Sequence, residues 1–283
     1  MKNILRTILF FSLILIAGVV QARVENVTET VDMQGANKLV LDCELGAGEF
    51  SIKPDNIIEG AIIDIEYNSR NISYLIDPVI KGDRCFLNLE SENRRKSNID
   101  TEDNIWDITL STRYETSLEM DIGACDAEFD LGGIPLKEMI LDIGAASGEI
   151  RFSKPNPIRM ETIDIDAGAT SLEMTSVGNA NFDNFIFSGG AGSFELDFRG
   201  EYKGHSEIEI EVGLGSVQII LPRGVACRVE SEGDGWLSSV DLHNHDLEEI
   251  DDDIYESEDF DRAKDKITLN IEVGLGSIDI YWK

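Results

Sequence analysis

Acidic residues recur at one fixed place in a motif that the sequence repeats, five positions after a glycine. Glu128, Glu149, Glu173 and Glu195 occupy this place in four consecutive copies of the motif. If the copies stack in register, these carboxylates form a column of opposed like charges, here called the glutamate ladder, and Ca²⁺, which takes several oxygen ligands, would screen them. The simpler interpretation is a solvated face that salt and water screen, since no known calcium-loop spacing is present.

The ladder belongs to two longer columns, both of which we expect to face outward. The column five positions after the glycine contains Ser51, Glu128, Glu149, Glu173, Glu195, Gln218 and Asp279. The second column lies on the other side of the glycine and contains Glu44, Asp121, Asp142, Asp166, Gly189, Glu211 and Glu272. A uniform column of this kind differs from the convergent cleft with a few perturbed carboxylates that catalysis requires.

Two histidines form the other candidate metal site. His243 and His245 lie in the segment VDLHNHDLEE, with Asp241 and Asp246 beside them. On a strand, both rings would face the same way and could share a transition metal. In a polar loop such a pair is more often simply solvated.

Nucleophilic and cofactor chemistry finds little support in the sequence. Ser193, Ser216 and Ser277 recur with the repeat, and a residue that every copy requires is architectural. His205, beside a glycine, has no adjacent nucleophile. The chain contains no P-loop, no dinucleotide fingerprint and no zinc pattern. We therefore expect a protein without catalytic residues and without a bound cofactor, Ca²⁺ excepted.

The repeated motif consists of alternating apolar residues, then Gly-x-small, then a second alternating run. Its first glycines are Gly46, Gly123, Gly144, Gly168, Gly190, Gly213 and Gly274. The central steps, from Gly123 to Gly213, are 21, 24, 22 and 23 residues, which is the length of one coil of a β-solenoid. Period-two alternation places Ile208, Ile210 and Val212 inward, and Glu209 and Glu211 outward.

Each position keeps its character from copy to copy, which favours a stack over a sandwich. Two residues after the glycine is a row of mostly small residues: Gly48, Cys125, Ala146, Thr170, Gly192, Gly215 and Gly276. Equivalent residues of stacked coils lie above one another and share one environment, whereas antiparallel strands give no such reason. We predict an all-β fold, a solenoid of 21–24-residue coils, with the small row at a tight corner.

The chain divides into three predicted parts. Residues 1–22 resemble a secretory signal, with Lys2 and Arg6 before an apolar run at 8–20 and a small-residue cleavage site at Val20-Gln21-Ala22. Residues 23–115 are expected to form a less regular β region. Residues 116–283 form the repeat solenoid, with an acidic loop at 233–266. The mature chain would then begin at Arg23, outside the bacterial cytoplasm.

Net charge excludes two classes of partner. The formal charge is −31, and removing Lys2 and Arg6 with the signal makes it −33. Such a chain is repelled by nucleic acid and by anionic lipid, and no segment after the signal is apolar for long enough to insert stably in a membrane.

Four cysteines, Cys43, Cys85, Cys125 and Cys227, are spaced too widely for a zinc site. Export would permit disulfides between them, whereas burial as small apolar side chains is the alternative that the inward positions of Cys43 and Cys125 favour.

The C-terminal part of the chain resembles a known family. The segment IEIEVGLGSVQIILPRGVACRV (208–229) and the later NIEVGLGSIDIYW (270–282), joined by a GDGW turn, are similar to toast-rack proteins. Among them they most resemble the C-terminal domain of LiaF-like proteins of the cell-wall-active antibiotic response. The resemblance covers 208–283 well, 116–207 as the repeating body, and 23–115 only loosely. It implies a β-helical stack, and in some members restraint of a membrane sensor kinase during envelope stress, although their membrane helices are missing here.

Two functions from different classes follow. The first is a non-enzymatic exported envelope protein of the periplasm or cell surface, whose repeat face binds an unknown envelope protein or polymer, as an adhesin-like surface or in the stress response. The alternative is a carbohydrate-active β-helix enzyme that acts on a wall or extracellular polymer.

Overall fold

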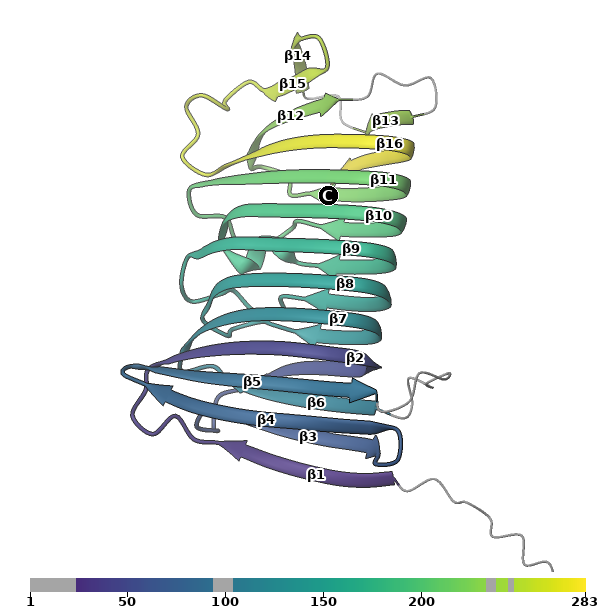
Figure 1. Ribbon diagram of the computed structural model, residues 1–283. Helices are drawn as coiled ribbons and strands as arrows, with labels where there is room; N and C mark the ends of the chain where they lie inside the picture. Colours follow the sequence, from purple (N-terminus) through teal and green to yellow (C-terminus); the bar gives the residue numbers. More distant parts are fainter. Residues whose placement is uncertain (1–23, 94–103, 233–237, 244–246) are drawn as a thin grey trace, which may run out of the picture.

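The computed structural model describes residues 24–93, 104–232, 238–243 and 247–283. Its body is a stack of seven long strands, each of which folds back on itself at one edge of the molecule, so that every strand forms one two-armed coil (Figure 1). The coils are β2 (Lys38–Asp55), β7 (Glu115–Asp130), β8 (Leu136–Arg151), β9 (Met160–Thr175), β10 (Phe182–Asp197), β11 (His205–Leu221) and β16 (Lys266–Trp282). The predicted β-solenoid is confirmed as an open stack of parallel coils.

The coils pair in the register that the glycines predicted. All seven are parallel, in the order β2-β7-β8-β9-β10-β11-β16. The small row lines up, for example Thr170 with Gly192, Gly192 with Gly215, and Gly215 with Gly276. A Cβ on Gly192 would lie 1.8 Å from the Thr170 carbonyl oxygen, and Gly215 adopts a φ of +148° that favours glycine. The structure therefore confirms the predicted tight corner at the small row.

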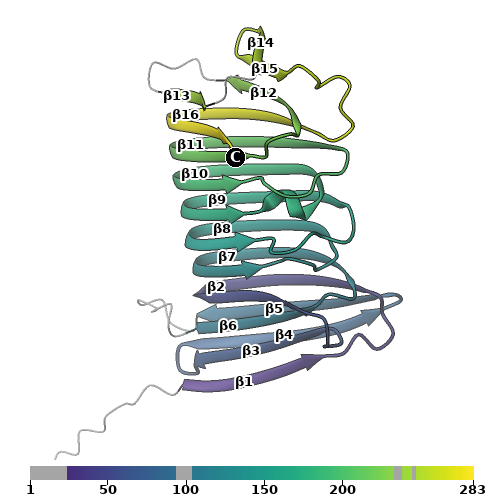
Figure 2. The same cartoon turned by 180° about the vertical axis from the view of Figure 1, so that it is seen from behind.

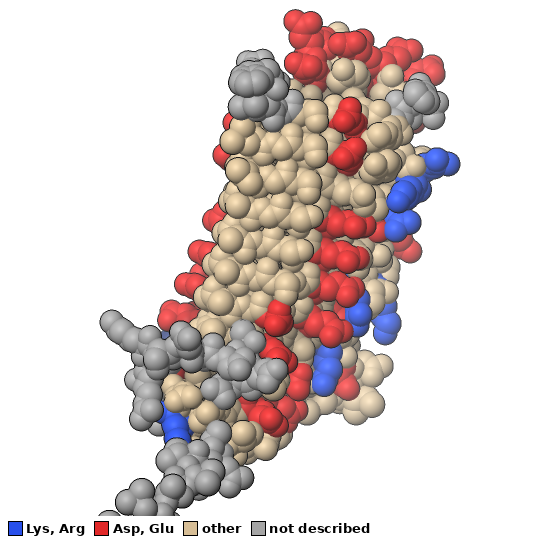
Figure 3. Space-filling model, turned by 90° about the vertical axis from the view of Figure 1, so that its right-hand side faces the viewer, with Lys and Arg blue, Asp and Glu red and all other residues tan. Residues whose placement is uncertain are grey.

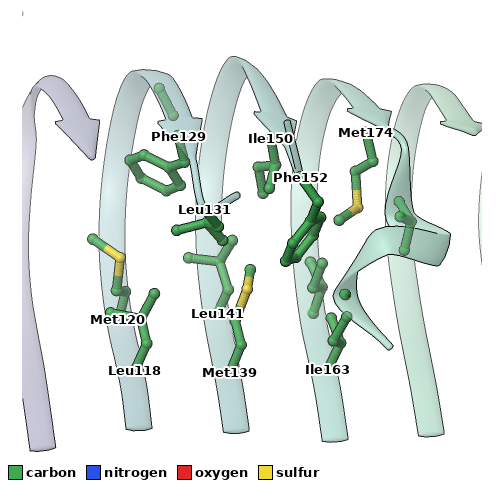
Figure 4. Packing of buried hydrophobic residues seen from close by; sticks show 14 of the residues in the cluster. Leu118, Met120, Phe129, Leu131, Met139, Leu141, Ile150, Phe152, Ile163 and Met174 are labelled. Carbon is green, nitrogen blue, oxygen red and sulfur yellow. The ribbon is translucent and has the colours of Figure 1, made fainter. Parts of the chain in front are cut away.

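The core lies between the two arms of each coil. Ile208, Ile210 and Val212 are at most 1 % exposed, as the alternation predicted, whereas Glu209 and Glu211 face solvent. In the close-up of Figure 4, Met120 from the first arm of β7 points toward Phe129 from the second. Both arms alternate with period two, so each coil buries apolar side chains from both sides.

Connecting loops close the side of the stack opposite the bends. Backbone and side-chain amides of asparagines link each loop to the next. Asn156 donates its backbone N–H to the Asn179 carbonyl (2.7 Å), and the Asn179 amide donates to the Phe152 carbonyl (3.0 Å). Asn179 lies in η2 (Val177–Ala180), the short 3₁₀ turn visible in Figure 2. These amides satisfy loop carbonyls that have no strand partner.

The N-terminal end is covered by a coil made of two separate strands. β5 (Arg84–Asn93) pairs in parallel with the first arm of β2, and β6 (Asn104–Ser111) with the second. Beyond them lie the antiparallel strands β4 (Ile72–Lys81), β3 (Ala61–Asn68) and β1 (Val24–Val31). Most of the less regular β region is thus antiparallel, although it includes one regular coil, β2. The sheet continues across residue 115, so the domain division there stays a prediction.

The C-terminal end repeats this plan. β12 (Ala226–Glu232) and β13 (Ser238–His243) pair in parallel with the two arms of β16, and the antiparallel strands β15 (Ile254–Ser257) and β14 (Leu247–Asp251) follow. Where we expected an acidic loop at 233–266, the structure has the strands β13, β14 and β15 within 238–257, and among the described residues only 258–265 form a strandless segment longer than a turn. Short alternating segments there extend the sheet because β12 offers them an unpaired edge.

Three further expectations concern the membrane, the signal and the cysteines. Among the described residues, no helix is long and apolar enough to span a bilayer. The predicted signal at 1–22 and its cleavage point lie outside the described residues. All four cysteines are buried free thiols, which confirms their expected role as small apolar side chains.

Candidate functional site

The glutamate ladder forms as predicted. Glu128 pairs with Glu149, Glu149 with Glu173, and Glu173 with Glu195, on successive second arms. Glu128, Glu173 and Glu195 are exposed, and Glu149 is half-buried. The register thus places four carboxylates one strand spacing apart, about 4.8 Å between backbones.

Two acidic residues that we did not predict extend the ladder. Asp107 of β6 pairs with Ser51 at the N-terminal end of the column, and Asp241 of β13 pairs with Asp279 at the C-terminal end. The separate strands that carry them lack the Gly-x-Gly motif, so no repeat signal marked them. A column of outward residues therefore runs from one end of the stack to the other.

Repulsion along the ladder is visible in its central member. Burial raises the pKa of Glu173 above its ordinary value, and the neighbouring charges of Glu195 and Glu149 raise it further. The lowest member has partial relief, because Arg151 Nη1 lies 3.9 Å from Glu128 Oε1. The ladder is a cost to folding that the rest of the stack offsets.

The second acidic column needs one correction. Asp166 pairs with Ser188, and Ser188 pairs with Glu211, so Ser188 is the member of this column. Gly189 lies one position further along, between Ala167 and Val212, in a row that faces the core. The reason is that the bend glycine of β10 is Gly190, and a shift of one residue in a strand exchanges the two faces.

The predicted metal ligands are the four glutamates of the ladder and the pair His243 and His245. In the described parts of the chain, no group of three or more His, Cys, Asp or Glu side chains is arranged to hold one metal ion. His243 stacks on Tyr281 with ring centroids 4.4 Å apart, and its Nε2 lies 2.9 Å from Asp279 Oδ1. His245 lies outside the described residues. The described partners of His243 are therefore Tyr281 and Asp279 of β16, and not a second histidine.

A surface of mostly small residues, uncharged in its upper part, lies between the two acidic columns, along the bends of the coils. Figure 3 looks directly onto it, a broad strip without charge in the upper part of the stack and with red columns on both sides. We call it the bend face. The residues that directly follow the bend glycines in the sequence form a row of exposed and half-buried apolar side chains on this face: Ala47, Ala124, Ala145, Ala169, Ala191, Leu214 and Leu275. The row two positions further on is Glu49, Asp126, Ser147, Ser171, Ser193, Ser216 and Ser277.

Packing does not impose the small size of the alanine row. Leu214 and Leu275 occupy the same position in the last two coils, pair with each other, and are 53 % and 45 % exposed. Because a leucine fits there without a clash, the alanines of the lower coils are not required by the corner. From Ala47 to Ala191 the bend face is therefore flatter than the fold demands, over four steps of strand spacing, or about 19 Å.

An acidic groove lies where the lower part of the bend face meets the ladder. It encloses about 420 Å³ and is lined by Glu49, Asp107, Asp126 and Glu128, among others. Asp107 accepts a hydrogen bond from the Ser51 hydroxyl, and Asp126 from the Ser147 hydroxyl. Each aspartate is thus held by a serine of the neighbouring strand.

Fold and surface together define a parallel β-solenoid that is covered at both ends and carries charge in rows. The family model for the N-terminal domain of toast_rack, DUF2154, matches residues 20–175. The chain belongs to the toast-rack family. The match includes the region 23–115, where we expected only a loose resemblance, while the narrower likeness of 208–283 to LiaF-like proteins stays a resemblance.

Solved structures with a similar arrangement come from several bacteria. A candidate cell adhesion protein from Clostridium sporogenes is 20 % identical, with 92 % of this chain and 100 % of that chain covered and a TM-score of 0.49. A candidate adhesin from Bacteroides fragilis is 11 % identical, with 90 % and 97 % covered and a TM-score of 0.37. No curated protein matches the chain.

Proposed function

We propose that this protein is an exported, non-enzymatic binding scaffold of the bacterial envelope, which holds an extended partner along the bend face. The observation that carries the proposal is the alanine row, which runs from Ala47 to Ala191 and is flat for about 19 Å although the position accepts leucine. A long flat strip suits an extended polymer or polypeptide better than a small substrate.

The two acidic columns select the partner by charge. They border the strip on both sides, in a chain whose formal charge is −31. A partner with cationic groups on either side of an uncharged centre complements this pattern, whereas nucleic acid and anionic lipid are repelled. The wall polymers and proteins of an envelope are the partners that export would provide.

Export itself is supported by the order of features at 1–22: positive residues, an apolar run and a small-residue site. Intact-mass analysis of protein from the native host tests it. We expect a chain that begins at Arg23, and recovery of a chain that begins at Met1 would reject export by this signal. A role in the envelope stress response rests on the LiaF-like resemblance, and loss of that response in a deletion strain would support it.

Co-sedimentation with purified cell walls of the native host tests the scaffold. The double variant Ala145→Arg, Ala191→Arg places bulk and positive charge on the bend face, and we expect it to lose most of the binding. The control Lys154→Ala, Lys203→Ala changes exposed residues outside the bend face and should bind as the wild type does. Equal sedimentation of all three proteins would overturn the proposal.

Treating the walls with a protease before the assay distinguishes a protein partner from a wall polymer. Binding that persists after the treatment would identify the polymer as the partner, because the protease removes the proteins. The same incubation tests the enzyme alternative. Soluble fragments released from the walls, and lost in Asp107→Asn or Asp126→Asn, would identify the acidic groove as an active site. We expect no release.

A further inference from the structure

The bend face differs between its two ends, because one of its two rows changes at each end. In the row that directly follows the bend glycines, alanines give way to Leu214 and Leu275 in the last two coils. In the row two positions further on, serines give way to Glu49 and Asp126 in the first two coils. The face is therefore acidic at its N-terminal end, small and rich in hydroxyl groups in the middle, and apolar at its C-terminal end.

Leu214 and Leu275 form an exposed apolar pair that the fold does not require. They are neighbours in the register of β11 and β16, and they are 53 % and 45 % exposed. Alanine occupies the same place in the five other coils, so the corner does not need a leucine. Side chains so exposed add little to the core and present apolar area to water. Two of them side by side, at the end of a flat strip, indicate a contact with another molecule.

The acidic groove forms the other end of the same strip. Its lining carries four carboxylates, from Glu49, Asp107, Asp126 and Glu128. Within the described part of the chain, only Glu128 of these four has an ion pair, with Arg151 at the long distance of 3.9 Å. Asp107 and Asp126 accept hydrogen bonds from serine hydroxyls, which do not compensate their charge. A cationic side chain that enters the groove would compensate it.

The distance between the two ends suits a short extended peptide segment. From the midpoint of β2 and β7 to the midpoint of β11 and β16, the stack rises by five strand spacings, or about 24 Å. An extended chain rises about 3.4 Å per residue, so about seven residues cover this distance. The alanines and serines between the ends leave room for the backbone of such a segment, because they are small.

The difference between the ends decides the class of partner. A repeating wall polymer presents the same groups at every repeat, so it does not match a strip that is acidic at one end and apolar at the other. A polypeptide can place cationic and apolar side chains at a fixed separation. We propose that the bend face binds an extended polypeptide, with cationic side chains in the acidic groove and apolar side chains on Leu214 and Leu275, about seven residues away. The proposal rests on the scaffold function, because it names the partner of the same surface.

Fluorescence anisotropy of labelled synthetic peptides with the full chain, at low ionic strength, tests this partner. The peptides KKSGSGSLL and LLSGSGSKK hold two lysines and two leucines at the required separation, in the two chain directions. We expect at least one of them to bind, and added sodium chloride to weaken it, because the lysines contact carboxylates. The peptide KKLLSGSGS has the same composition without the separation, and we expect it to bind about tenfold more weakly.

A double variant at the apolar end locates the leucines of the peptide. Leu214→Ser, Leu275→Ser removes the exposed apolar pair, and we expect it to weaken binding about tenfold. The control Ile57→Ser, Ile250→Ser makes a matched change at isoleucines outside the bend face that are 77 % and 53 % exposed. We expect this control to bind the peptide as the wild type does.

A second double variant, at the acidic end, locates the lysines. Glu49→Gln, Asp126→Asn removes two carboxylates of the groove and should also weaken binding about tenfold. The control Glu119→Gln, Glu209→Gln removes the same net charge from outward positions of the first arms. Its binding should stay within about twofold of the wild type, because screening limits the reach of distant charges.

Failure of both separated peptides to bind, equal binding of KKLLSGSGS, or an equal loss in a double variant and its control would overturn the proposal. Co-sedimentation with walls keeps this failure distinct from failure of the scaffold function. If no peptide binds but protease-treated walls still do, the polypeptide is rejected and the scaffold holds a wall polymer. Peptide binding without wall binding would support the polypeptide and contradict the wall as its location.

Discussion

The two ends of the stack share one plan but treat buried polar groups differently. At each end, two separate strands replace a full coil and antiparallel strands lie beyond them, which are β4, β3 and β1 at the N-terminal end and β15 and β14 at the C-terminal end (Figure 1). At the N-terminal end, Asn104 donates to the Ala47 carbonyl (2.9 Å) and accepts from Trp106, and the Ser91 hydroxyl accepts from the Gly46 N–H (3.0 Å). These side chains satisfy the bend of β2, which has no complete coil below it.

At the C-terminal end, the buried indole Nε1 of Trp282 has no oxygen or nitrogen acceptor among the described residues and lies beside the Cys227 thiol. There the covering strands are held by exposed or half-buried contacts, such as the stack of His243 on Tyr281 and the Arg228 guanidinium over the Phe260 ring (4.6 Å). The comparison teaches that the N-terminal end is built as a seal, whereas the C-terminal end leaves its tryptophan without a strong acceptor. A seal satisfies every buried polar group, because an unsatisfied one has a large cost.

The largest expected effect tests whether the coils between the ends hold the molecule together. Gly215→Val places a Cβ 2.0 Å from the Gly192 carbonyl oxygen at a φ of +148°, and we expect a loss of more than about 3 kcal/mol in the free energy of unfolding. Gly192→Val should act similarly. Thermal melts followed by circular dichroism measure it. The control Ala191→Val lies on the exposed row next to this corner and should change stability by less than about 0.5 kcal/mol. If the glycine variants melt with the wild type, the corner model is wrong.

The next effect tests the seal. Asn104→Ala leaves the Trp106 N–H and the Ala47 carbonyl without partners in a fully buried site, and we expect a loss of about 2–4 kcal/mol. Urea unfolding at constant pH provides the measurement. Asn184→Ala removes an exposed amide and should be nearly neutral. A small loss in both variants would mean that the side chains of the N-terminal end are not needed to satisfy the bend.

A matched pair of tryptophan variants compares the two ends directly. Trp106→Phe deprives Asn104 of a donor and should cost about 1–2 kcal/mol. Trp282→Phe removes a donor that has no acceptor, so we expect it to be neutral within about 0.5 kcal/mol, or stabilising. Urea unfolding of both proteins is the test. Equal losses would contradict the difference between the ends.

The smallest effect concerns the ladder that joins the ends. Because the pKa of Glu173 is raised in the folded state, its ionisation opposes folding, and the penalty grows as pH rises through that raised pKa. Glu173→Gln should therefore raise the melting temperature at pH 7 and have no effect below about pH 4, where the carboxyl is protonated in both states. Solvent screening limits the gain to about 0.3 kcal/mol. Glu201→Gln, an exposed loop residue, is the control, and a gain that persists at low pH would exclude the electrostatic cause.

Melting in calcium chloride distinguishes a calcium site on the ladder from simple screening of its charges. Sodium chloride should stabilise the wild type by screening alone, and a true calcium site would stabilise it further at matched ionic strength. The variant with Glu128, Glu149, Glu173 and Glu195 all changed to Gln should respond to neither salt. We expect equal melts of the wild type in the two salts, since the described carboxylates form a row and no three of them converge.

The sequence by itself determined the coil. Period-two alternation around a recurring glycine specified which residues face inward, and the uniform rows specified that equivalent residues lie above one another. The glutamate ladder followed from that register without any further information. The misplacement of Gly189 shows the limit of this reasoning, because in a strand one residue of error exchanges core and surface.

Only the tertiary structure decided what happens where the repeat stops. β16 inserts between β11 and β12, and β2 lies between β7 and the pair β5 and β6, so the chain order at both ends differs from the order in the sheet. The placement of Asp107, the placement of Asp241 and the acidic groove all depend on these pairings. No local pattern encodes them, because a strand chooses its partner by competition among all the edges that the folded chain offers, and that choice brings together residues far apart in the sequence.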